Sequence, residues 1–208
     1  MFKSLLHAIA GTVVLLVVAL SSLAQNQVPP KPFGFELGMT KAQLITAIGQ
    51  KAITEEKDDV LVLSTAPNPH SSFDSYMVLI SPDKGLLKVV AEGLTISVND
   101  EGDQLKDEFE KIYDGLISKY GKGKRYDFVE GGEANREAEF WMVTLLHGER
   151  TLRVDWNYDD KTGGNTQTGI ALEANALSIN KGYISVTYEF PGWNAYAEAR
   201  KAKQDSVF

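Results

Sequence analysis

The 208-residue sequence contains no cysteine. This absence excludes disulfide bonds, a thiolate nucleophile, zinc sites with cysteine ligands and iron–sulfur clusters. It also excludes attachment of a lipid to an N-terminal cysteine. Histidine is scarce: only three are present, and His7 lies in the N-terminal leader described below. The stability of the folded chain must therefore come from apolar burial and hydrogen bonding.

The sequence also has no surplus of positive charge. It has 21 Lys and Arg against 28 Asp and Glu, which gives a formal net charge of −7. Basic residues are scattered, apart from the short run Lys122, Lys124 and Arg125. Nucleic-acid-binding proteins instead cluster basic residues on one face. We therefore expect no nucleic-acid partner, whereas 43% hydrophobic and 24% charged residues are typical of a globular protein.

One long apolar run is present, at the N-terminus. Lys3 is followed by uncharged residues from Ile9 to Leu20, and the sequence Ser22-Leu23-Ala24 places small residues before Gln25. This order is typical of a secretory signal peptide. We interpret residues 1–24 as a signal peptide and expect a periplasmic or secreted protein with no stable membrane anchor after cleavage. The alternative is an uncleaved anchor formed by the same segment.

The remainder divides into three parts. Residues 25–32 are proline-rich and form an extended lead-in. Residues 33–121 are predicted to form a first half and residues 122–208 a second half, each with the order helix, three strands, helix. The predicted helices cover residues 41–48, 105–120, 134–146 and 195–204, and the predicted strands cover 60–66, 76–81, 86–98, 152–158, 170–177 and 183–190.

This pattern predicts an α+β fold in which helices pack on one face of antiparallel sheets. The two halves suggest an internal duplication. One continuous domain with two similar hairpins is the alternative.

The first predicted helix has a distinctive start. Thr40 is placed to cap it, with Gln43 at the capping-box position and Gly49 after its last turn. The segment resembles the opening helix of the SmpA/OmlA family of small envelope proteins, through Gly38-Met39-Thr40-Lys41-Ala42-Gln43-Leu44 and Ile48-Gly49. The resemblance implies a two-layer α+β fold, with the tandem-repeat β-lactamase inhibitory protein as a fold relative, and a non-catalytic binding or assembly role. The chain differs from that family in lacking the lipoprotein cysteine and a proline after Gly49.

Motifs for cofactors and metals are incomplete. The segment from Asp155 begins like a calcium-binding EF-hand loop, but Asp160 replaces the required glycine and Thr166 the closing glutamate. There is no Gly-rich phosphate loop, no His-Glu-x-x-His and no Gly-x-Ser-x-Gly. We therefore expect no metal and no cofactor.

Two functional hypotheses follow. The first is an exported binding protein that recognises another protein or a cell-envelope component. Its contacts are predicted on the polar face of the second half, at Arg153, Asp155, Asn157 and Glu173. The second is an envelope hydrolase with paired carboxylates, for which the candidates are Asp127, Glu137, Glu139 and Asp155, with Trp141 available to stack on a sugar.

Overall fold

A computed structural model describes residues 30–157 and 168–206. The predicted signal peptide lies outside the described residues, as does most of the lead-in. The segment that begins like a calcium loop at Asp155 also lies outside them from residue 158 onward. Among the helices that are described, none has the length and apolar character needed to span a membrane.

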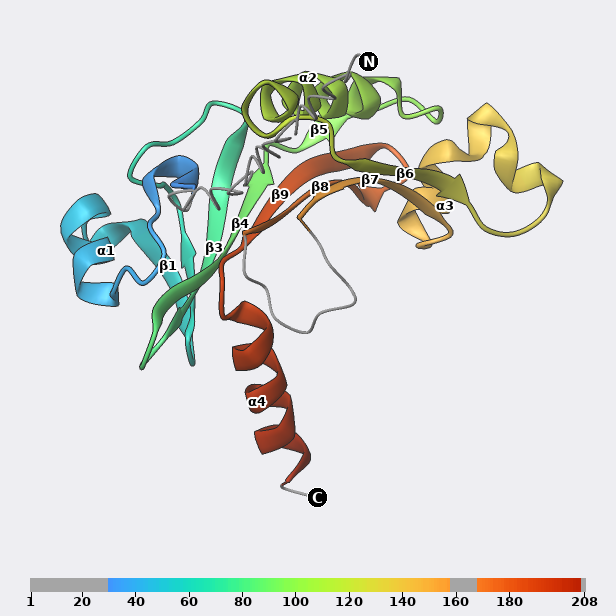
Figure 1. Ribbon diagram of the computed structural model, residues 1–208. Helices are drawn as coiled ribbons and strands as arrows, with labels where there is room; N and C mark the ends of the chain where they lie inside the picture. The colour runs from blue at the N-terminus through green and yellow to red at the C-terminus, as the bar shows by residue number, and fades with distance from the viewer. Residues whose placement is uncertain (1–29, 158–167, 207–208) are drawn as a thin grey trace, which may run out of the picture.

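The first half of the chain contains two α-helices and five strands (Figure 1). In chain order they are α1 (Lys41–Ile48), β1 (Ile53–Lys57), β2 (Val60–Leu63), β3 (Phe73–Ser81), β4 (Gly85–Gly93), β5 (Ile96–Ser97) and α2 (Asp103–Tyr120). Short 3₁₀ turns, η1 (Pro32–Gly34) and η2 (Gln50–Ala52), flank α1.

The second half begins with a strand. Its elements are β6 (Lys124–Val129), the 3₁₀ turns η3 (Glu133–Arg136) and η4 (Ala138–Phe140), α3 (Trp141–Leu146), β7 (Arg150–Trp156), β8 (Gly169–Ser178), β9 (Lys181–Glu189) and α4 (Trp193–Asp205).

All strands in the described part of the chain belong to one antiparallel sheet. The order is β1-β2-β3-β4-β9-β8-β7-β6, and the short β5 pairs with the far end of β9. The order is symmetrical about the β4–β9 pair, so each half contributes four consecutive strands. An antiparallel sheet with four helices confirms the predicted α+β class.

Two strands were not predicted from the sequence, and one predicted helix and one predicted strand are divided in the structure. The edge strands β1 and β6 were missed because their residues are mostly polar, as solvent-facing edges require. The basic run at Lys124 therefore begins a strand. The helix predicted over 134–146 is interrupted, since Glu137 has an extended backbone (φ −68°, ψ 145°) and only Trp141–Leu146 is α-helical. The strand predicted over 86–98 is divided into β4 and β5.

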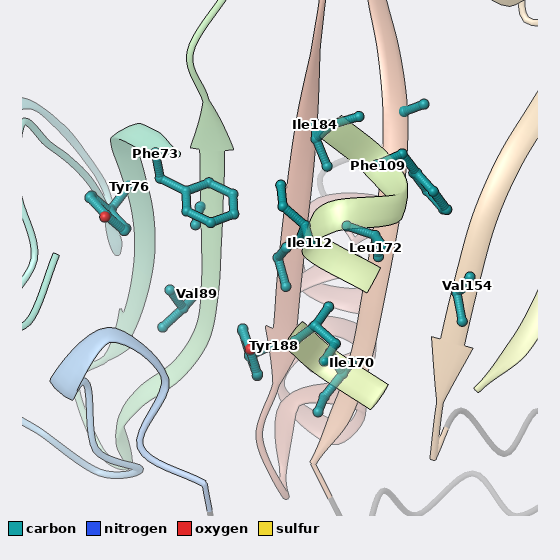
Figure 2. Packing of buried hydrophobic residues seen from close by; sticks show 14 of the residues in the cluster. Phe73, Tyr76, Val89, Phe109, Ile112, Val154, Ile170, Leu172, Ile184 and Tyr188 are labelled. Carbon is teal, nitrogen blue, oxygen red and sulfur yellow. The ribbon is translucent and has the colours of Figure 1, made fainter. Parts of the chain in front are cut away.

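The core lies between the sheet and helices α1 to α3. Helix α2 buries a stripe with helical spacing, Leu105, Phe109, Ile112 and Leu116. Phe109 and Ile112 face residues of β8 and β9 across the layer, including Leu172, Ile184 and Tyr188 (Figure 2). Each fully buried side chain of this kind contributes about 1.5–3 kcal/mol.

The predicted capping box of α1 is present. The Thr40 hydroxyl accepts a hydrogen bond from the Gln43 backbone N–H at 3.3 Å, and the Gln43 side chain accepts one from the Thr40 N–H at 2.8 Å. The Gly38 N–H just before this helix donates to the Leu86 carbonyl at the start of β4. Only glycine fits at the neighbouring position 85, because Gly85 has a φ of +70° and a Cβ there would lie 2.2 Å from the Gly38 carbonyl oxygen.

We therefore predict that Gly85→Ala destabilises the protein by about 3 kcal/mol or more, because a left-handed backbone strain adds to a steric clash with backbone atoms. Gly148→Ala is the matched control. Gly148 also has a positive φ (+73°), but a Cβ added there would have nothing within 4 Å of it, so its cost is limited to about 1–2 kcal/mol. Urea unfolding of the two variants measures the difference, and equal losses would contradict the steric account.

A second prediction concerns alkaline pH. Burial raises the pKa of Tyr188 well above its usual value near 10, and the neighbouring Tyr120 raises it further. The unfolded chain therefore releases this proton at lower pH than the folded chain does. The contribution of the neutral phenol to stability is complete below about pH 10 and is lost as pH rises from there through the folded-state pKa.

We expect the free energy of unfolding to fall less steeply above about pH 10 in Tyr188→Phe than in the natural protein. The measurement is urea unfolding at a series of pH values from neutral to strongly alkaline. Parallel curves for the two proteins would contradict the prediction.

Candidate binding surface

The sheet face opposite α1, α2 and α3 is called here the outer face. Side chains alternate along each strand, so the residues between the buried positions point to this side. The strand register aligns them in rows across the sheet. The middle row, from β1 to β6, consists of Glu55, Val62, Met77, Val90, Thr187, Ala171, Asp155 and Lys124.

A second row lies one step along the strands and is called the charged row. From β3 to β6 it consists of Ser75, Glu92, Ser185, Glu173, Arg153 and Tyr126. Segments from both halves of the chain therefore contribute to one surface, with its two central strands, β4 and β9, side by side (Figure 1).

Three of the four predicted binding residues come together on this face. Arg153 Nε lies 2.7 Å from Asp155 Oδ1, and Arg153 Nη1 lies 3.1 Å from Glu173 Oε2. Arg153 and Glu173 are direct cross-strand partners on β7 and β8. One guanidinium therefore holds two carboxylates in fixed positions, and such a bridge orients all three side chains.

Asn157 is not part of this cluster. It follows β7 with a φ of +56°, and its side-chain amide donates to the Thr168 carbonyl at 3.3 Å. Because Thr168 directly precedes β8, this hydrogen bond joins the ends of two neighbouring strands. A pocket of about 310 Å³ opens beside Asn157 and is also lined by Tyr120, Lys122, Lys124 and Asp155.

The charged row continues beyond the predicted residues. Glu92 and Glu173 flank Ser185 on either side, and the Asn175 amide donates to the Ser185 hydroxyl at 2.9 Å. Nearby, burial raises the pKa of Tyr183, and the charges of Glu92 and Glu173 raise it further. The outer face of β4, β9 and β8 is therefore locally acidic.

A second ion pair joins the two halves of the chain. Lys88 on β4 lies 2.7 Å from Glu189 on β9, and the side chain of Glu189 is only 12% exposed. The Lys88 ammonium also lies 4.6 Å from the ring of Trp193 at the start of α4. These contacts attach the first turn of α4 to the outer face.

The β2–β4 part of the middle row is apolar. Val62, Met77 and Val90 are adjacent across three strands, and Met77 is 38% exposed. Sequence analysis missed this part and the Lys88–Glu189 pair. The alternation of apolar and polar residues in the strands was visible, but the strand order that places these residues on the same face as Arg153 was not.

The four carboxylates proposed for hydrolysis do not all lie together. Asp127 and Asp155 lie on opposite faces of the sheet, because the cross-strand partner of Asp155 is Lys124, three residues from Asp127. Glu137 and Glu139 lie on the exposed segment before α3.

Trp141 is not placed to stack on a sugar. It is buried, with 5% of its surface exposed, and the centre of its ring lies 4.7 Å from the Lys106 ammonium and 5.7 Å from the Arg150 guanidinium. Burial also lowers the pKa of Arg150. Within residues 30–157 and 168–206, no group of three His, Cys, Asp or Glu side chains is arranged to hold a metal ion.

Comparison of the chain with protein-family models, curated proteins and solved structures finds no match. The resemblance of the Gly38–Gly49 segment to the SmpA/OmlA family therefore stays a prediction from local sequence.

The Arg153 bridge gives a stability prediction. Arg153→Ala removes the guanidinium that pairs with Asp155, whose side chain is just 16% exposed. We expect a loss of about 1–3 kcal/mol for a partly buried carboxylate that loses this charged partner. Glu173→Gln is the control, because the Glu173 side chain is 41% exposed and such pairs contribute less than about 1 kcal/mol. Urea unfolding at neutral pH compares them, and a larger loss in Glu173→Gln would contradict the assignment.

Proposed function

We propose that this protein is an exported, non-catalytic binding protein of the cell envelope, and that its outer face docks a protein partner. The observation that supports this most is the composition of that face. An apolar strip around Met77 adjoins a charged row in which Arg153 bridges two acids.

The combination suits protein recognition for a physical reason. Protein interfaces commonly surround an apolar, desolvated centre with polar groups. Complementary charges across such an interface increase the specificity of binding more than its affinity. Side chains already held in ion pairs lose little conformational entropy on binding. The Arg153 and Lys88 pairs supply such ordered groups, and Met77 adapts to the shape of the surface that it meets.

The envelope assignment is supported by the leader sequence, with Lys3, the apolar run and the small residues before Gln25. The local resemblance of the α1 segment to the SmpA/OmlA family supports the same location. The absence of cysteine means that the chain needs no disulfide formation in an oxidising compartment.

The experiment exchanges charges within an ion pair. Arg153→Glu combined with Glu173→Arg keeps opposite charges directly across β7 and β8 but inverts their order on the outer face. Asp155→Asn is added to this variant, because Asp155 lies 2.7 Å from Arg153 and would otherwise meet a like charge. Glu108→Lys combined with Lys111→Glu is the matched control. It exchanges the charges of an ion pair on α2, on the other side of the sheet, in which Lys111 Nζ lies 3.0 Å from Glu108 Oε2. Each protein is used to capture partners from an envelope extract, and bound proteins are quantified by mass spectrometry.

We expect the natural protein and the α2 control to retain the same partner, and the outer-face exchange to lose it. Equal loss in both charge-exchange variants would contradict the outer face as the docking surface, as would retention of the partner by both. Circular dichroism checks that all three proteins are folded.

A further inference from the structure

We infer that two copies of this chain associate through the edge strand β6, which extends the sheet across a two-fold axis at Tyr126. The inference is independent of the proposed function. It rests on the backbone groups and the charge order of Lys124–Val129.

The geometry of β6 suits pairing with another strand. Its six residues pair with β7 without a break, from Lys124 opposite Asp155 to Val129 opposite Arg150. Just beyond, the Glu130 N–H donates to the Glu149 carbonyl at 2.6 Å. Because hydrogen-bonding direction alternates along an antiparallel strand, the backbone groups of Arg125, Asp127 and Val129 point away from β7. No hydrogen bond to these outward groups is seen in the described part of the chain.

The side chains make this edge complementary to itself. Within one chain Arg125 lies 2.7 Å from Glu110 and 3.6 Å from Asp127. With the axis at Tyr126, Arg125 also faces Asp127 of the partner subunit, and the symmetry forms this pair twice. These are the residues whose backbone groups point outward, so each pair combines two backbone hydrogen bonds with opposite charges.

The other sheet face gains contacts in the same register. Lys124 faces Phe128 of the partner subunit, and two copies of Tyr126 meet at the axis. Phe128 is 46% exposed in the single chain, and Lys124 already lies 4.8 Å from the ring of Tyr126. A cation beside aromatic rings, together with the covered apolar surface, favours this arrangement.

The two neighbouring registers and the other sheet edge are unfavourable. An axis at Arg125 or Asp127 would place like charges directly opposite each other, which destabilises a strand pair. The opposite edge, β1, has a register shift between Ile53 and Glu55, and an axis at Glu55 would oppose two carboxylates. The order of charges along β6 therefore disfavours pairing with strands that lack the complementary order. It is complementary to the order on a second copy of the chain.

The first test measures molecular mass by light scattering during gel filtration. We expect twice the mass of one chain for the natural protein and single-chain mass for Arg125→Asp and for Asp127→Arg. An equimolar mixture of the two variants should recover the doubled mass, because every pair in the mixed dimer is again opposite in charge. A natural protein with single-chain mass, or variants that keep the doubled mass, would overturn the inference, as would failure of folded variants to recover it when mixed.

The second test needs no change of charge on β6. Because the chain has no cysteine, a single substitution gives an unambiguous disulfide report. Residues at the axis in this register form a non-hydrogen-bonded pair with Cα atoms about 4.5 Å apart, within disulfide range. Tyr126→Cys should form a covalent dimer on mild oxidation, and Glu55→Cys on β1 should stay a single chain. Absence of the Tyr126→Cys dimer, or equal crosslinking at both positions, would overturn the inference.

Discussion

The pairing of β4 with β9 is the constraint on which the rest of the structure depends. It joins strands far apart in the chain, Lys88–Glu92 with Ser185–Glu189, and makes one sheet from two four-strand units. It also aligns Val89 with Tyr188 and Ala91 with Val186, which are buried beneath the helical layer. Without this pair, each unit would expose a strand edge and part of its apolar face.

The same pairing determines the two faces of the sheet. On β4 and β9, each residue that points toward α2 is followed by a residue that points to the outer face, because side chains alternate along a strand. Thus the register that buries Tyr188 also places Lys88 beside Glu189 and Glu92 beside Ser185. The same strand register therefore determines both the core packing and the charged row. A shift of that register by one residue would exchange the two faces of the sheet.

Much of the fold could be predicted from sequence because its signals are local. The stripe from Leu105 to Leu116 predicts α2, and the alternation from Leu152 to Trp156 predicts β7. The edge strand β6 could not be recognised, since Lys124, Arg125 and Asp127 obscure its alternation. Of the site, Arg153, Asp155 and Glu173 were predicted, together with Asn157, on the polar face of the second half, but their contacts with one another were not. Lys88, Glu92 and Met77 were missed because their place on the same face depends on long-range strand order.

Amide hydrogen exchange resolved along the chain tests the central claim most directly. If the β4–β9 pair unites a single cooperative core, the inner amides of β4 and β9 exchange only through global unfolding, with the same free energy of opening as those of α2. Exchange of the β4 and β9 amides at a distinctly lower free energy than the remaining core, with each half protected separately, would contradict the claim.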